Sequence, residues 1–195
     1  MKLIKNAVVL TMNAARQVYR DGAVAFDGDS IVEVGKTADL LDKYTYDEVI
    51  DDLPLADWLL KCIYPLSYHL DEDASRVGAE LSALELMRSG VTTYVDSHYI
   101  TRDKRCYDGI AAGTLRTGIR GVIVRSTVNN PETTPEPFLE PIDVAQKECA
   151  RVIEAYHGYQ DGLLSVRVEA LNESSATPDM IRAMYDVSRQ YNVGM

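Results

Sequence analysis

The chain has 195 residues, of which 46% are apolar, and a formal net charge of −10. This length suits one domain, or one and a fraction, and the apolar share is enough for a core. The negative charge disfavours nucleic acid and anionic membranes as partners, because both attract clustered lysine and arginine. No apolar run is long enough to span a bilayer, and the N-terminus has no extended apolar stretch like a secretory signal. The three cysteines show no metal-binding spacing, so we expect a cytoplasmic protein with reduced thiols.

Residues 1–51 have short apolar runs that are separated by turn residues. Between two of these runs lies Asp27-Gly28-Asp29, a sequence typical of a hairpin turn. We therefore predict a small antiparallel β unit over residues 1–51, which is followed by a second domain over 52–195.

Three later segments carry apolar residues at helical spacing, and we expect all three stripes to face a core. The stripes consist of Val77, Leu81 and Leu84; of Cys149, Val152, Ile153 and Tyr156; and of Met180, Met184, Val187 and Tyr191. Thr177-Pro178 is a typical cap and first turn for the last of these helices.

A repeated pattern joins the helices to strands. A helical stretch ends in Gly90, Gly118 or Gly162, and an apolar strand follows each glycine at once. A fourth copy starts at residues 191–193. Strands that alternate with helices indicate an α/β fold with parallel pairing. In such folds the chemistry is found at the carboxyl ends of the strands.

Polar side chains follow each predicted strand. Asp96, Ser97 and His98 end the first strand, Arg125 ends the second, and Glu173 follows the third. In one parallel sheet these residues would line one cleft, where they could bind a polar small molecule and move protons. Each residue also has a structural alternative. His98 could be a loop histidine, Arg125 could neutralise Asp96 or Glu173, and Glu173 could cap the next helix.

Two further features have open interpretations. Trp58, the only tryptophan, could line a pocket or belong to a core. The loop over residues 129–141 contains four prolines, and it could be a lid over a site or a solvated excursion. The sequence has no GxSxG, GxGxxG, GxxxxGK[ST], HxH or HExxH motif, and its three histidines lie far apart.

The chain resembles the amidohydrolase superfamily, in the branch of triazine hydrolases and of melamine, guanine and S-adenosylhomocysteine deaminases. The resemblance rests on four stretches in order: the first strand pair at 3–12, the "I-x-D-G-x-I-x-x-V-G" hairpin at 25–35, the "L-x-x-W-L" helix start at 53–59, and the "x-G-x-T-T-x-x-D" strand at 89–96. This implies part of a (β/α)8 TIM-type barrel, here its N-terminal half, preceded by the small β unit.

The chain also departs from the family pattern. The family's "P-G-x-x-N-x-H-x-H" segment, whose histidines bind the metal, is missing at the Asp51–Asp52 junction, and the later metal-binding histidine and aspartate are missing as well. A closed barrel typically needs ~250 residues. We therefore expect that residues of a longer enzyme are absent here, and that the 195 residues alone bind metal poorly and are inactive.

The resemblance implies a metal-dependent hydrolase that deaminates or dechlorinates an amino- or halo-substituted N-heterocycle. We expect a divalent metal, zinc, in the intact parent, where it would activate the attacking water. The metal ligands and catalytic residues would lie outside this sequence, and Trp58, Asp96, Ser97, His98, Arg125 and Glu173 would form the substrate pocket. We also expect a homo-oligomer. The alternatives are a non-enzymatic or partner-completed βα fragment, or a metal-independent isomerase or lyase that uses Asp96 and His98.

Overall fold

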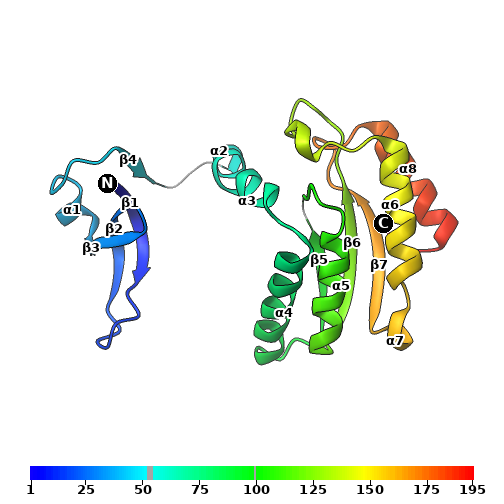
Figure 1. The fold of residues 1–195 in the computed structure, drawn as a ribbon, viewed down its shortest axis with the longest axis horizontal. Helices are drawn as coiled ribbons and strands as arrows, with labels where there is room; N and C mark the ends of the chain where they lie inside the picture. The colour runs from blue at the N-terminus through cyan, green and yellow to red at the C-terminus, as the bar shows by residue number, and fades with distance from the viewer. Residues whose placement is uncertain (52–54, 99) are drawn as a thin grey trace. The chain divides into compact units, whose positions relative to one another are not determined.

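The computed structural model describes residues 1–51, 55–98 and 100–195 (Figure 1). It divides into two compact units, Met1–Trp58 and Leu59–Met195. The predicted boundary after residue 51 stays a prediction, because residues 52–54 lie outside the described residues. We expect a missing segment at the Asp51–Asp52 junction. Residue 52 also lies outside the described residues, so this expectation is not tested by the structure.

The first unit contains a four-stranded sheet in the order β3-β2-β1-β4. Its strands are β1 (Lys2–Leu10), β2 (Val18–Asp27), β3 (Ser30–Lys36) and β4 (Glu48–Ile50), and its helices are α1 (Thr37–Leu40) and α2 (Leu55–Trp58). The predicted hairpin joins β2 to β3, where Gly28 has a positive φ of 57°. β1, β2 and β3 pair antiparallel as predicted, whereas the short β4 pairs parallel to β1.

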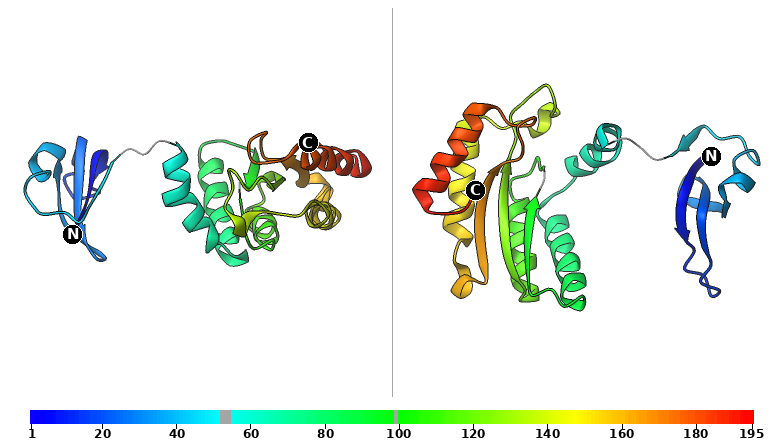
Figure 2. Two further views of the ribbon diagram at one scale, coloured as in Figure 1. Left: turned by 90° about the horizontal axis from the view of Figure 1, so that it is seen from above. Right: turned by 180° about the vertical axis from the view of Figure 1, so that it is seen from behind.

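The second unit contains a three-stranded parallel sheet in the order β5-β6-β7, so β5 and β7 are its outer strands (Figure 2). The strands are β5 (Thr93–His98), β6 (Arg120–Thr127) and β7 (Leu164–Ala170). The helices are α3 (Tyr64–Tyr68), α4 (Glu72–Arg88), α5 (Cys106–Thr117), α6 (Ile142–Tyr156), α7 (Tyr159–Gly162) and α8 (Pro178–Tyr191), together with a π-helical η1 (Leu59–Ile63) and a 3-10 η2 (Glu136–Phe138).

Local sequence signals set the ends of these helices. Gly118 takes the left-handed conformation and ends α5, with φ 75° and its N–H bonded to the Thr114 carbonyl. This is the glycine-terminated pattern predicted from sequence. The Asp71 side chain accepts a hydrogen bond from the Ala74 N–H at the start of α4, and Thr177 accepts one from the Met180 N–H at the start of α8.

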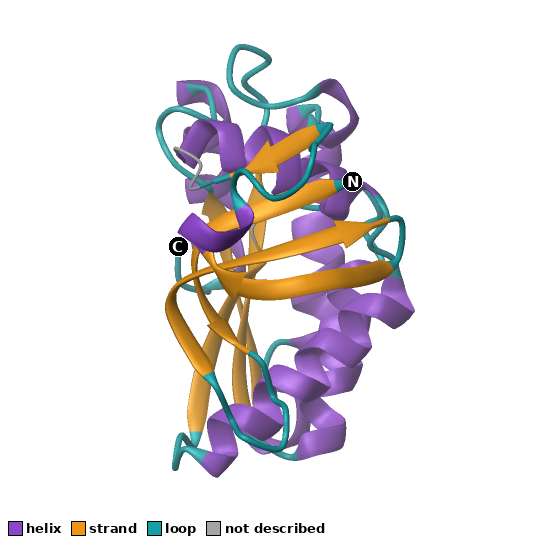
Figure 3. Cartoon of the chain, turned by 90° about the vertical axis from the view of Figure 1, so that its left-hand side faces the viewer, coloured by secondary structure: helices purple, strands orange, loops and turns teal. Residues whose placement is uncertain are grey.

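Helices α5, α6 and α8 cover one face of the second sheet. Figure 3 distinguishes the helices and strands of the chain by colour. Ile123, Leu164, Val166 and Val168 point from the strands into a core that these helices complete. Cys149 and Val152 of α6, and Met180 and Met184 of α8, are 0% exposed, so two of the three predicted apolar stripes are confirmed as core-facing.

The third predicted stripe, on α4, is wrong. Val77, Leu81 and Leu84 are exposed, at 49%, 58% and 51%. The buried side chains of α4 are instead Ser75, Ala79 and Ala83. Small residues face α5 because the two helix backbones approach closely there. A Cβ atom on Gly109 of α5 would lie 2.1 Å from the Glu72 carbonyl oxygen, and one on Gly113 would lie 2.5 Å from the Arg76 carbonyl oxygen.

The fourth copy of the pattern begins beside β7, where the Val168 N–H donates to the Gly194 carbonyl at 3.1 Å. The predicted fold class is therefore confirmed: an α/β protein with a small β unit followed by successive parallel strands and helices, as in part of a (β/α)8 barrel. Within the described residues, no helix combines the length and apolarity needed to cross a bilayer.

Candidate functional site

The carboxyl ends of the three parallel strands lie level with one another. His98 of β5 is in register with Arg125 of β6, and Arg125 is in register with Val168 of β7. Side chains alternate between the two faces of a sheet, so neighbouring residues at this edge point in opposite directions. The edge therefore has a helix-covered face and an opposite face, which are described in turn.

Arg125 lies on the helix-covered face and is fully buried. Its Nη2 donates to Glu140 Oε1 at 2.6 Å and its Nη1 donates to Glu140 Oε2 at 3.0 Å. Lys104 Nζ lies 2.9 Å from the same Glu140 Oε1. Burial alone would raise the pKa of Glu140, but the two cations more than offset it and lower that pKa. The predicted alternative that Arg125 neutralises a carboxylate is thus realised with Glu140 and not with Asp96 or Glu173.

His98 and Arg125 meet at the ring of Tyr107 on α5. The His98 ring packs edge-on against Tyr107 with centroids 5.5 Å apart, and the Arg125 guanidinium lies 4.8 Å from the Tyr107 centroid. Burial, together with the positive charge of Arg125, lowers the pKa of His98 to about 4. His98 is therefore neutral at pH 7, and its buried Nε2 has no hydrogen-bond partner among the described residues. The adjoining Tyr99 lies outside the described residues.

Asp96 points the same way as His98, because it lies two residues earlier in β5. Burial raises the pKa of its carboxyl. Tyr94, two residues earlier again, bonds to Thr114 of α5, which fixes this face as the helix side.

The opposite face carries a different group of three side chains. Ser97 Oγ of β5 donates to Glu169 Oε1 of β7 at 2.6 Å, and Ser126 Oγ of β6 donates to the same oxygen. One carboxylate thus joins the ends of all three strands. Of these three residues, only Ser97 was predicted from sequence as a site residue. The available signal for Glu169 was the polar alternation of Ser165, Arg167 and Glu169 within an otherwise apolar strand.

Two predicted site residues remain, Glu173 in the second unit and Trp58 in the first. Glu173 is exposed in the turn after β7, and the predicted cap of α8 is supplied by Thr177 instead. Trp58 ends α2 in the first unit and is 43% exposed. The structure therefore divides the predicted cluster: Asp96, His98 and Arg125 lie on the helix-covered face, Ser97 lies on the other face, and Glu173 lies in a turn.

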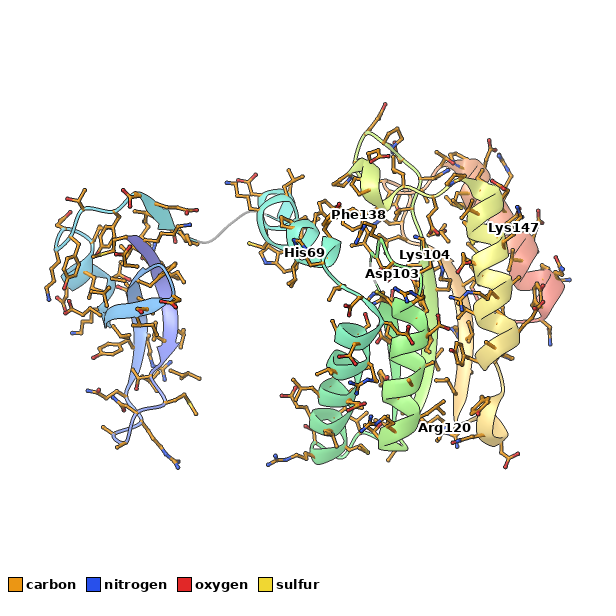
Figure 4. The ribbon with its side chains drawn as sticks, viewed as in Figure 1. His69, Asp103, Lys104, Arg120, Phe138 and Lys147 are labelled. Atoms are coloured by element: carbon orange, nitrogen blue, oxygen red, sulfur yellow. The ribbon has the colours of Figure 1, made fainter. Side chains whose placement is uncertain are left out.

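The loop over residues 129–141 is ordered and is fastened to the loop after β7. The N–H groups of Asn129 and Asn130 both donate to the Ser175 carbonyl at 3.0 Å. Phe138 is 3% exposed and packs on Tyr64 with ring centroids 5.7 Å apart. The interpretation as a solvated excursion is therefore wrong. Phe138 and Lys104 lie at the carboxyl end of the strands, and Arg120 lies at the opposite end (Figure 4).

A small cavity of about 10 Å³ lies beneath this loop, which is room for about one water molecule. Its wall includes Lys104, Arg125, Phe138 and Glu140. This cavity is too small for a heterocyclic ligand.

The described residues do not fit a catalytic metal. Among residues 1–51, 55–98 and 100–195, no three His, Cys, Asp or Glu side chains are grouped so that they could hold a metal ion. Asp96 and His98 lie two residues apart on β5, and the positive charge of Arg125 acts on His98. A divalent ion therefore needs ligands that this part of the chain does not supply.

The chain is similar to known proteins in sequence and in fold. The sequence pattern described as the amidohydrolase family matches residues 43–195. A 5-methylthioadenosine/S-adenosylhomocysteine deaminase from Thermoanaerobacter pseudethanolicus is 24% identical over 99% of this chain and 48% of its own length. A protein of the same name from Thermococcus onnurineus is 35% identical over 48% of this chain and 21% of its own length.

Solved structures show the same fold. Zinc-bound atrazine chlorohydrolase variant E241Q from Arthrobacter aurescens superposes with a TM-score of 0.64 at 22% identity, over 98% of this chain and 51% of its own. Guanine deaminase from C. acetobutylicum gives a TM-score of 0.62 at 15% identity, over 98% and 51%.

The chain thus spans about half the length of the curated relatives it matches across its whole length. One such alignment extends over 217 positions, which is more than the 195 residues of the chain, so it includes positions at which this chain has no residue. This supports the expectation that a segment present in relatives is missing here. Since the family pattern covers residues 43–195, the chain belongs to the amidohydrolase family.

Proposed function

We propose that this chain forms the first half of the barrel of a metal-dependent amidohydrolase that removes an amino, alkylamino or halide group from a small N-heterocycle. The observation that carries the proposal is the family match over residues 43–195, which includes all three parallel strands and their carboxyl edge. Relatives named as deaminases of nucleosides or guanine, and a neighbour named as a chlorohydrolase, support this reaction class. A cytoplasmic location is part of the proposal.

The chain's own contribution would be to bind and orient the substrate. Ser97, Ser126 and Glu169 form a pre-arranged group on the face opposite to helices α5, α6 and α8. Both hydroxyls donate to Oε1, so Oε2 is left to accept a hydrogen bond from an amino or hydroxyl group of a ligand. Glu169 would therefore favour a substrate that presents a donor at this edge.

The other predicted pocket residues would act at the rim. Asp96, His98 and Arg125 face the helices, so they would reach a ligand only past the ends of the strands. Glu173 is exposed and free to turn toward a ligand, and Trp58 would supply an aromatic wall. We propose these residues as secondary contacts, behind Ser97 and Glu169.

A divalent metal in the complete enzyme is supported by neighbours whose titles include zinc. When bound, such an ion supplies an activated water for attack on the ring carbon. The described residues of this chain do not form its site, so no step of the reaction is assigned to them through the metal.

The experiment that tests the proposal begins with the mass of the protein purified from its natural source. We expect a mass well above 21.7 kDa, because the residues present account for about half of a relative. That protein should release ammonia or halide from members of a panel of purines, pyrimidines, pterins and triazines. Activity should vanish on metal chelation and return with zinc.

The 195-residue chain is the matched control, and it should contain less than stoichiometric zinc by elemental analysis. Failure of the metal-loaded natural protein to act on any panel member would reject the proposal. A natural mass of 21.7 kDa would instead favour the second candidate, a βα fragment that a partner completes, which the half-length coverage of relatives also supports.

A further inference from the structure

The guanidinium of Arg125 is bonded to the backbone of the residue that follows it. The Arg125 Nη1 that donates to Glu140 Oε2 at 3.0 Å also donates to the Ser126 carbonyl. The hydroxyl of Tyr107 lies 3.4 Å from the same carbonyl oxygen and can donate to it as well. Side chains of the helix-covered face therefore hold the backbone of β6 at its carboxyl end.

The Ser126 carbonyl lies on the β5 side of β6. The carbonyl of Thr127, the next residue, accepts from the Leu171 N–H on the β7 side, and the backbone groups of successive strand residues point to opposite sides. The last pair of the β5–β6 ladder joins His98 to Arg125, so Ser126 lies one residue past it. A buried carbonyl needs a hydrogen-bond donor, and the two side chains provide one here.

The side chain of Ser126 acts on the other face of the sheet. Its hydroxyl donates to Glu169 Oε1, the oxygen that also accepts from Ser97. A serine hydroxyl is separated from its own backbone by a single rotatable bond with three staggered positions. A backbone that Arg125 holds in place therefore limits where the hydroxyl can point, and with it the orientation of the Glu169 carboxylate.

The connection is enclosed within the described part of the chain. Arg125 is 0% exposed, Glu140 is 4% exposed and Ser126 is 5% exposed. Glu140 is itself fixed, because its N–H donates to the Val128 carbonyl at 3.0 Å and Lys104 contacts its carboxylate. The groups that hold the guanidinium in place are therefore all present in this structure.

We propose that Arg125 and Glu140 are positioning residues of the amidohydrolase site, which act on Glu169 through Ser126. Glu140 holds the two terminal nitrogens of Arg125, and Arg125 holds the backbone of Ser126. Ser126 then holds one oxygen of Glu169 and leaves the other to a ligand. The inference rests on the proposed function only in treating Glu169 as a ligand-binding group. The effect of Arg125 on a ligand passes through Ser126.

Carbon-13 NMR of the Glu169 side-chain carboxylate in the 195-residue chain tests the connection without a ligand. Ser126→Ala removes the hydroxyl and defines the change in the carboxylate chemical shift when that bond is lost. Glu140→Gln keeps the side-chain shape but removes the charge that holds Arg125, so it should move the signal in the same direction. Arg125→Lys should do likewise, because lysine lacks the planar fork of arginine.

The control for lost stability is Val187→Ala on α8. Val187 is 4% exposed, so this change opens a cavity in the core, but the residue takes no part in the hydrogen bonds described above. The Glu169 signal should stay in place in this variant. The proposal is overturned if Ser126→Ala leaves the signal unchanged, or if neither Glu140→Gln nor Arg125→Lys moves it. An equal change in Val187→Ala also overturns it, since the signal would then report lost stability alone.

Kinetics of the natural protein separate this inference from the proposed function. On the panel member with which that protein is most active, Ser126→Ala and Glu140→Gln should each raise KM by up to about tenfold, with kcat little changed, because a hydrogen bond to a charged group is lost or loosened. An unchanged KM in Ser126→Ala would reject Glu169 as a ligand-binding group, which is part of the proposed function. A KM that rises in Ser126→Ala but not in Glu140→Gln would overturn the positioning role instead.

Discussion

Ser97 and Glu169 are joined by a 2.6 Å hydrogen bond that crosses from β5 to β7 over the intervening strand β6. Because Ser126 of β6 donates to the same oxygen, the bond ties the ends of the whole sheet together. We expect a measurable coupling between the two residues in stability, in addition to any role in binding.

A double-mutant cycle with Ser97→Ala and Glu169→Gln measures that coupling by chemical denaturation. The two changes should be non-additive by about 1.5 kcal/mol, the lower end of the net value of a hydrogen bond to a charged group, because Ser97 is exposed. Ser97→Ala combined with Glu154→Gln on α6 is the control, and it should be additive. Additivity in the first cycle would mean that the bond does not form in solution.

His98 should make stability depend on pH. Its pKa is about 4 in the folded chain and 6.5 when unperturbed, so the unfolded state takes up a proton first as pH falls. The contribution of neutral His98 to the free energy of unfolding is fully present above pH 6.5. It is lost as the pH falls from 6.5 to about 4, and the total loss is up to about 3 kcal/mol. The variant His98→Gln should therefore lose less stability over this interval than the parent chain. Carboxyl groups titrate in both proteins, so the difference isolates His98. The exposed His69, changed to Gln, should leave the parent slope intact.

Breaking the buried ion pair should be costly. In Arg125→Met the Glu140 carboxylate keeps only Lys104 as a cationic partner, and the free energy of unfolding should fall by about 3 kcal/mol. Arg182→Met removes an exposed pair with Asp179 and should cost less than about 1 kcal/mol. Urea unfolding measures both variants. An equal loss in the free energy of unfolding would contradict the expected effect of burying the Arg125–Glu140 pair.

Two glycine substitutions should have opposite effects on stability. Gly113→Ala would bring a methyl group 2.5 Å from the Arg76 carbonyl oxygen, so α4 and α5 must separate, at a cost of roughly 1–3 kcal/mol. Gly78→Ala meets nothing within 4 Å, and alanine is favoured over glycine in a helix by up to about 1 kcal/mol. Thermal unfolding at low protein concentration compares the two variants. A stable Gly113→Ala protein would contradict the close approach of the helices.

The order of elements could be predicted because its signals are local. Gly118 ends a helix by its own conformation, and Thr177-Pro178 starts one, so neither needs information from distant residues. The alternation of helix and strand was enough to predict the parallel sheet. The buried faces of α6 and α8 could be predicted because each helix has a single apolar stripe.

The face of the sheet or helix on which each side chain lies could not be predicted from local signals. A shift of one residue reverses every side chain of a strand, so Ser97 and His98 point to opposite faces although both end β5. On α4 two stripes share the helical period, and the small one is buried because α5 offers glycines to it. The partner of Arg125 also could not be predicted, since Glu140 lies near the end of a long loop whose path depends on distant contacts.

Asn129 links the loop after β6 to the start of α8. Its side chain accepts a hydrogen bond from the Thr177 N–H at 2.8 Å and donates to the Thr177 hydroxyl at 3.0 Å. That hydroxyl is the one that starts α8. A replacement of Asn129 would therefore disturb two loops and a helix start at once. Any redesign of the proposed substrate site should therefore replace the loop after β6 and the loop after β7 together.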